Sequence, residues 1–140
     1  PLRRFIALKV FNMVLVARQS GEPQAAVLQM AEAIDGGADL LIFPEGTRNA
    51  NDNVLLQPFK SGLYHLAMAR PECELLPVWI HNIQRVLPKG KLLPVPMLCS
   101  VRFGQPFRGG DFTEKEDFLA FAQATLLAQQ PVLRQEERGL

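Results

Sequence analysis

The segment Asp39-Leu-Leu-Ile-Phe-Pro-Glu-Gly-Thr-Arg48 carries the strongest fold signal in this chain. Its first five residues, 39–43, form a short apolar run that is typical of a strand buried on both faces. Pro44 cannot donate a hydrogen bond to a sheet, so the strand is expected to end there. A glycine, a hydroxyl and a guanidinium then follow, which predicts polar groups at the carboxyl end of a strand, where open α/β sheets bind ligands. The alternative interpretation is a strand-to-helix turn with a surface pair between Glu45 and Arg48.

A second strand and a helix are predicted on the amino-terminal side of this segment. Residues 11–17 form an apolar run that ends at Arg18. Pro23 suits the first turn of a helix, whose apolar residues recur at i, i+3, i+4 and i+7, and two glycines close it. A strand–helix–strand unit is almost always a right-handed parallel crossover. We therefore expect Arg18 and Arg48 at the ends of two neighbouring parallel strands, close enough to contact one ligand.

The remainder of the chain continues the alternation of helices and strands. A helix is predicted over residues 59–70, strands over 74–80 and 96–103, and a last helix follows. The predicted fold class is α/β, with a mostly parallel sheet flanked by helices. One domain is expected over residues 1–130, followed by a polar tail at residues 131–140.

Composition excludes several classes of function. A net charge of +1 without a basic run that carries aromatics gives no reason to expect nucleic acid. Cys73 and Cys99 are far apart and lack metal-site spacing, so they are interpreted as buried free thiols, and no metal site is expected. No run of 18 uncharged apolar residues predicts a membrane span. A nucleotide-binding α/β domain is the weaker alternative, because no glycine-rich phosphate loop follows any strand.

Three blocks in order make the chain resemble a known family. They are Phe-Pro-Glu-Gly-Thr-Arg at 43–48, Phe-Lys-Ser-Gly at 59–62 and Leu-Pro-Val-Trp-Ile at 76–80. Together they resemble the phospholipid-synthesis acyltransferases, the superfamily of lysophosphatidic acid and glycerol-3-phosphate acyltransferases. The resemblance implies a glycerol-3-phosphate acyltransferase-like fold and 1-acylglycerol-3-phosphate O-acyltransferase-like chemistry. It also implies transfer of a fatty acyl group from acyl-coenzyme A or acyl carrier protein, as co-substrate, to a hydroxyl of a lysophospholipid or glycerol phosphate, without a bound cofactor.

The resemblance also implies which residues form the site. The substrate-binding residues would be Arg18, Phe43, Pro44, Glu45, Gly46, Thr47, Arg48 and Lys60. Pro77 and Val78 would lie on the acyl-donor side, or belong simply to a core strand. The two arginines suit an acceptor phosphate, because a planar guanidinium can bond two oxygens at once.

Several of these roles have alternatives. Glu45 would orient Arg48 or accept a hydrogen bond from a glycerol hydroxyl, and Gly46 would let the backbone approach the substrate. Thr47 would donate to phosphate or cap the next turn. Lys60 would face the site or lie as a surface lysine with its stem on apolar neighbours.

One block of the family pattern is not found in the chain, namely a histidine followed five positions later by an aspartate. Five positions after His65 comes Arg70, and five after His81 comes Val86. The resemblance then implies the carboxyl-terminal portion of an acyltransferase, truncated at the N-terminus and inactive alone. A non-catalytic module that binds lipid phosphate is the alternative. Because phospholipid precursors reside in bilayers, a peripheral position on the cytoplasmic face of a membrane is expected.

Overall fold

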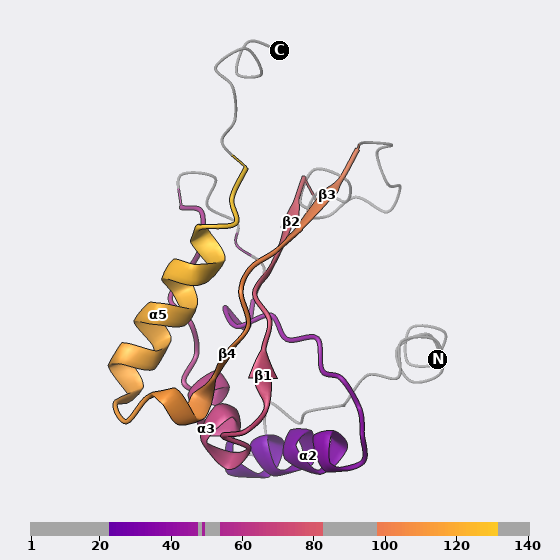
Figure 1. Ribbon diagram of the computed structural model, residues 1–140, viewed down its shortest axis with the longest axis vertical. Helices are drawn as coiled ribbons and strands as arrows, with labels where there is room; N and C mark the ends of the chain where they lie inside the picture. The colour runs from indigo at the N-terminus through magenta and orange to yellow at the C-terminus, as the bar shows by residue number, and fades with distance from the viewer. Residues whose placement is uncertain (1–22, 48, 50–53, 83–97, 132–140) are drawn as a thin grey trace.

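The computed structural model describes residues 23–47, 49, 54–82 and 98–131 (Figure 1). Within these ranges helices and short strands follow one another, as the α/β class requires. In chain order they are α2 (Pro23–Asp35), α3 (Gly62–Ala69), β1 (Glu74–Leu75), β2 (Val78–His81), β3 (Ser100–Phe103), β4 (Phe107–Arg108), the 3-10 helix η2 (Gly109–Asp111) and α5 (Lys115–Leu127). No helix in the described part of the chain is long and apolar enough to cross a membrane.

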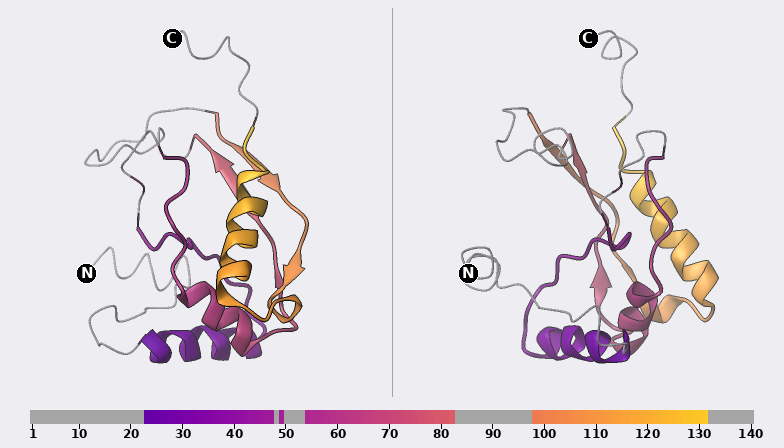
Figure 2. Two further views of the ribbon diagram at one scale, coloured as in Figure 1. Left: turned by 90° about the vertical axis from the view of Figure 1, so that its left-hand side faces the viewer. Right: turned by 180° about the vertical axis from the view of Figure 1, so that it is seen from behind.

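The strands form two antiparallel ladders, one after the other along a twisted ribbon (Figures 1 and 2). In one ladder β2 pairs with β3, and Val78 lies opposite Phe103; in the other, β1 pairs with β4. The strand predicted over residues 74–80 is therefore interrupted, because Pro77 has no N–H for the ladder. Its carbonyl oxygen instead accepts from the N–H of Gly104 at 2.9 Å. The described residues contain no parallel ladder, so they do not show the mostly parallel sheet.

Residues 39–43 form no strand, contrary to the prediction. Leu40 and Ile42 are half-buried, whereas Leu41 and Phe43 are 73% and 69% exposed. The expectation of burial on both faces is therefore wrong, because exposed and half-buried residues alternate along the segment. The predicted strand over residues 11–17 lies outside the described residues.

Helix α2 begins and ends as predicted. After Asp35 the N–H of Gly36 donates to the carbonyl of Glu32, and the N–H of Gly37 donates to Ile34 at 2.9 Å. Gly37 has φ of +85°, a left-handed conformation that glycine adopts without a steric penalty. The glycine pair thus satisfies carbonyl groups that the helix end leaves without partners.

An aromatic cluster forms the centre of the core between α3, β4 and α5. Phe118 of α5 is fully buried. It contacts the rings of Tyr64, Phe107 and Phe112, with centroid distances between 5.6 and 6.0 Å. These separations suit aromatic pairs, several of which meet edge to face. The 3-10 helix packs closely against α3, and this is possible because Gly109 has no side chain. A Cβ atom at this position would lie only 2.6 Å from the carbonyl oxygen of Ala67.

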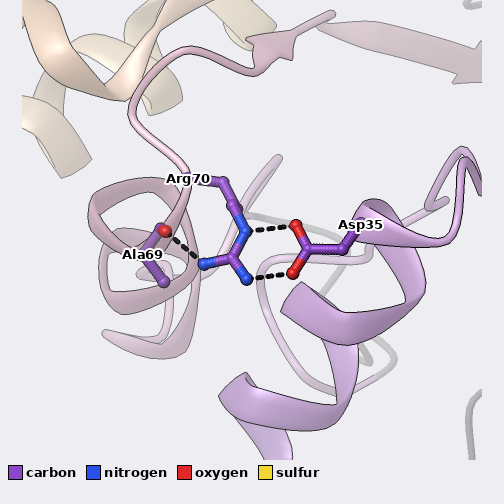
Figure 3. A network of polar contacts seen from close by, with 3 residues as sticks. All are labelled: Asp35, Ala69 and Arg70. Atoms are coloured by element: carbon purple, nitrogen blue, oxygen red, sulfur yellow. Dashed lines mark hydrogen bonds and ion pairs between the residues drawn. The ribbon is translucent and has the colours of Figure 1, made fainter.

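A bidentate ion pair joins the carboxyl ends of α2 and α3 (Figure 3). Arg70 Nε donates to Asp35 Oδ1 at 2.6 Å, and Nη2 of the same guanidinium donates to Oδ2. The guanidinium also donates from Nη1 to the carbonyl oxygen of Ala69 at 2.6 Å. Hydrogen bonds from Arg70 lower the pKa of Asp35 below its usual value.

Replacing Asp35 by asparagine should remove a pH-dependent part of the stability. A carboxyl whose pKa is lowered by folding stabilises the protein above its unfolded pKa of about 3.9, and this contribution is lost as the pH falls through the lowered value. Urea midpoints of the parent chain and Asp35→Asn should therefore differ at neutral pH and converge below about pH 4. Asp39→Asn, at an exposed residue without an ion pair in the described ranges, is the control. A constant difference from neutral to low pH would contradict the prediction.

Candidate functional site

The site is built on the turn that follows residues 39–43. The N–H of Gly46 donates to the carbonyl of Phe43 at 3.0 Å, and Gly46 has φ of +70°. The N–H of Lys60 donates to the carbonyl of Pro44 at 2.8 Å, so the first and second family-like blocks lie side by side. The left-handed conformation at Gly46 explains why a residue without a Cβ atom follows Glu45.

Glu45 strengthens the same junction. Its Oε2 accepts a hydrogen bond from the backbone N–H of Gln57 at 2.7 Å. This contact lies between groups that are partly buried, where hydrogen bonds to a charged group contribute about 1.5–3 kcal/mol. The carboxylate therefore holds in place the segment that leads from Gln57 to Lys60. The sequence did not indicate this role. Arg48, the partner proposed from the sequence, lies outside the described residues.

A pocket of about 280 Å³ lies where this turn meets α2 and α3. Its walls are mostly apolar, and Lys60 is the charged residue among those that line it. The lining residues are Met30, Ile42, Phe43, Pro44, Gly46, Lys60, Gly62, Leu63 and Leu66. Mostly apolar walls with a small number of polar or charged groups are the usual composition of a small-molecule site. The pocket therefore suits a ligand with an aliphatic part and an anionic group.

Lys60 lies across the turn at the rim of the pocket. A Cβ atom at Gly46 would lie 3.2 Å from Lys60 Cγ and 3.8 Å from Lys60 Cε, so the aliphatic stem passes directly over the glycine. The residue as a whole is exposed. The stem of Lys60 therefore covers backbone, as the surface interpretation expects, and a role of its ammonium group in the site stays a prediction.

The structure brings some of the predicted site residues together and separates others. Phe43, Pro44, Gly46 and Lys60 line the pocket, and Glu45 and Thr47 flank it in the chain. Pro77 and Val78 are not among its lining residues; Pro77 is buried and Val78 is half-buried in β2. Arg18 and Arg48 lie outside the described residues, so their convergence on one ligand stays a prediction.

Sequence reasoning missed much of the apolar wall. Met30 of α2 and Leu63 and Leu66 of α3 line the pocket, although the sequence analysis assigned no site role to them. Their position in the chain could have indicated that they line the pocket. All three belong to the two helices that flank the Glu-Gly-Thr-Arg block in the sequence. Periodicity identifies an apolar face without telling whether it is completely covered.

Cysteine, histidine and acidic side chains are the other candidates for metal ligands or reactive groups in the described ranges. No group of three or more His, Cys, Asp or Glu side chains there is arranged to hold a metal ion. Cys73 and Cys99 are free thiols; Cys73 is half-buried and Cys99 is exposed, so the expected burial is wrong for Cys99. His65 is exposed on α3, and its ring packs edge-on to Tyr64 with centroids 5.6 Å apart.

Comparison with known proteins shows which protein family the chain resembles. Residues 4–81, more than half of the chain, match the family described as Acyltransferase. The chain is 30% identical over 95 residues to a 1-acyl-sn-glycerol-3-phosphate acyltransferase of Limnanthes alba and equally to one of Limnanthes douglasii, in each case over 65% of this chain and 33% of the relative. It is 28% identical over 98 residues to a protein of the same description from Cocos nucifera, over 67% of this chain and 31% of that protein.

These matches establish the family. The chain belongs to the phospholipid and glycerol acyltransferase superfamily. It spans about a third of the length of the relatives that it matches. No solved structure matches it significantly.

Proposed function

We propose that this chain forms the acceptor-binding part of a 1-acylglycerol-3-phosphate O-acyltransferase-like enzyme. Its ligand would be a lysophospholipid or glycerol phosphate, and the acyl donor would be acyl-coenzyme A or acyl carrier protein, without a bound cofactor. The observation that carries this proposal is the apolar pocket with Lys60 at its rim, built from the blocks that match the family. The names of the three relatives support the same acceptor class.

The pocket accounts for recognition of such an acceptor in two parts. Met30, Leu63 and Leu66 provide an apolar wall for aliphatic chain. The Lys60 ammonium group provides a cation for phosphate oxygens, and hydrogen bonds between charged groups are about twice as strong as neutral ones. Arg18 and Arg48, which stay predictions, would add guanidinium groups on the same phosphate.

Acyl transfer needs a group that removes the proton of the acceptor hydroxyl. The hydroxyl oxygen attacks the thioester carbonyl carbon, the carbon–sulfur bond breaks, and the thiol leaves with a proton. Neither histidine of the chain is followed five positions later by an aspartate. We therefore propose that these residues bind and position the acceptor without supplying the base. The same observation favours the second candidate function, a non-catalytic module that binds lipid phosphate.

Two further expectations remain part of the proposal. The mostly parallel sheet would require residues 39–43 to pair with a partner strand. A peripheral position on the cytoplasmic face of a membrane follows from the proposed acceptor, which resides in bilayers.

Replacing Lys60 by alanine should weaken binding of a short-chain, monomeric lysophosphatidic acid by about 10- to 100-fold. The expectation rests on one charge-assisted hydrogen bond of about 1.5–3 kcal/mol, with about 1.4 kcal/mol for each factor of ten. Isothermal titration calorimetry of the parent chain and the variant measures the ratio. Binding of the matching monoacylglycerol, which has no phosphate, should not change.

Two variants make the Lys60 test specific. Lys60→Arg keeps a cation at the rim and should retain most of the affinity. Lys115→Ala removes an exposed lysine of α5 that pairs with Glu116 at 3.3 Å, and it should bind as the parent does. Equal affinity of the parent and Lys60→Ala for lysophosphatidic acid would exclude this pocket as the phosphate site.

A further inference from the structure

Gly62 is a glycine at a position where the surrounding structure does not require one. Gly37 and Gly46 have positive φ, and a Cβ atom at Gly104 or Gly109 would come within 2.9 Å of another residue. Gly62 has neither feature. Beyond its chain neighbours and its own helix backbone, no atom of the described residues would lie within 4 Å of a Cβ atom at Gly62. The backbone and the described neighbours therefore leave room for a side chain at this position.

The stability of the helix does not account for this glycine either. Gly62 is the first residue of α3, a helix of eight residues. Glycine loses more conformational freedom than any other residue when it is fixed in a helix, so alanine is the better helix former. An explanation for the glycine must therefore come from the space beside it.

Gly62 lines the pocket and lies on the same face of α3 as the apolar wall. Residues three and four apart are neighbours on a helix surface, so Leu66 lies next to both Gly62 and Leu63. All three residues line the pocket. Because a Cβ atom in a helix leans toward the amino-terminal end, a side chain in place of Gly62 would extend from this face toward the turn that carries Lys60. Such a side chain would occupy space in the pocket.

This space lies between the charged part and the apolar part of the pocket. Lys60 precedes Gly62 by two residues, and Leu63 and Leu66 follow it. A ligand whose anionic group meets Lys60 and whose aliphatic chain lies along the two leucines must pass Gly62 where the chain begins. The space that a side chain would take is therefore the space that the first methylene groups of such a ligand need.

We propose that Gly62 is a specificity-determining residue that admits an aliphatic chain beside the anionic group of the acceptor. The favoured acceptor then already carries an acyl chain, as lysophosphatidic acid does, and is preferred over unacylated glycerol phosphate. The mostly apolar walls of the pocket support this preference, because glycerol phosphate has no chain to place against them. The inference rests on the proposed function, since it requires the acceptor to occupy the pocket.

Calorimetric titration of the full 140-residue chain with two acceptors tests the proposal. The acceptors are monomeric hexanoyl lysophosphatidic acid and glycerol 3-phosphate, and the parent should bind the first more tightly. Gly62→Ala should weaken binding of the lysophosphatidic acid about fourfold, the effect of one buried methylene group, and Gly62→Leu about tenfold or more. Both variants should lose much less affinity for glycerol 3-phosphate, so that the ratio of the two affinities falls.

Thermal unfolding separates this role from a structural one. Gly62→Ala should leave Tm unchanged or raise it by up to about 4 °C, because alanine favours the helix. Weaker binding by a variant at least as stable as the parent shows that lost space, and not lost structure, explains the effect. A clear fall in Tm would show that the position is already filled or constrained, and it would overturn the proposal.

Ala69→Leu is the matched control on the same helix. It adds a leucine side chain to the last residue of α3, which is exposed and is not among the residues that line the pocket. This variant should bind both acceptors as the parent does. If Ala69→Leu loses as much affinity for lysophosphatidic acid as Gly62→Leu, the effect belongs to the helix as a whole and the proposed role of Gly62 is refuted.

Failure of this proposal and failure of the proposed function give different results. Binding of lysophosphatidic acid that depends on Lys60 but is unchanged or stronger in Gly62→Leu refutes the role of Gly62 and leaves the proposed function standing. The same holds if the parent binds glycerol 3-phosphate at least as tightly as the lysophosphatidic acid. A parent chain that binds neither acceptor refutes the proposed function, and the role of Gly62 with it.

Discussion

The 140-residue chain, incubated with acyl-coenzyme A and lysophosphatidic acid, is expected to release coenzyme A no faster than the uncatalysed background. A positioned general base contributes about 10²–10⁴ in rate, or roughly 3–5 kcal/mol of barrier. His65 is exposed on α3 and packs against Tyr64, and His81 lies on β2 opposite Ser100. Neither histidine is among the residues that line the pocket. A thiol-release assay with a chromogenic thiol reagent measures the rate.

The same assay, applied to histidine variants, can show whether either histidine of the chain acts as the base. His65→Ala and His81→Ala should leave the residual rate unchanged, since neither side chain is placed to act on an acceptor in the pocket. Binding of lysophosphatidic acid, measured in parallel, should persist at the affinity that depends on Lys60. Robust transfer that either histidine substitution abolishes would show that the chain contains its own base and would refute the proposed division of roles.

Phe118→Ala is expected to unfold the chain or leave it marginally stable. Phe118 is the large side chain that is fully buried in the described residues, and it contacts three other aromatic rings. Replacing a buried phenylalanine by alanine costs about 3–5 kcal/mol, from lost transfer free energy and from the cavity left behind. The free energy of unfolding of a domain is only about 5–15 kcal/mol, so this is a large share. Urea unfolding followed by circular dichroism gives the difference.

Phe121→Ala provides the matched comparison in the same helix. Phe121 contacts Phe107 and Phe112 with centroids 5.2 and 5.1 Å away, but almost half of its side chain is exposed. It should therefore cost clearly less than Phe118→Ala. Similar losses for both variants would mean that the aromatic cluster is stabilised by ring contacts and not mainly by burial.

Local signals were predictable from the sequence because they depend on neighbouring residues. The helix that starts at Pro23 and ends before Gly36-Gly37 is present as predicted. The approach of Gly46 and Lys60 was not predicted, and the site roles that the resemblance implies for these two residues stay predictions. The interruption of the 74–80 strand could also have been read from Pro77, whose missing N–H removes it from a ladder.

Pairing across the chain was not predictable in the same way. The apolar run at 39–43 does not tell whether one or both faces are covered, and Leu41 and Phe43 are exposed. The direction of strand pairing depends on residues far apart, and the two described ladders are antiparallel. The contact of Glu45 with the backbone N–H of Gln57 was missed because a main-chain donor leaves no trace in the residue types.

The turn under the pocket has a consequence for the order in which the chain folds. The contact between Glu45 and Gln57 spans 12 residues, whereas that between Asp35 and Arg70 spans 35. Chain-closure entropy grows with the logarithm of the span, so the shorter contact is favoured by roughly 0.9 kcal/mol at the outset. The turn beside the pocket can therefore form before the more distant ends of α2 and α3 come together. The aromatic cluster around Phe118 would then pack after this local turn has formed.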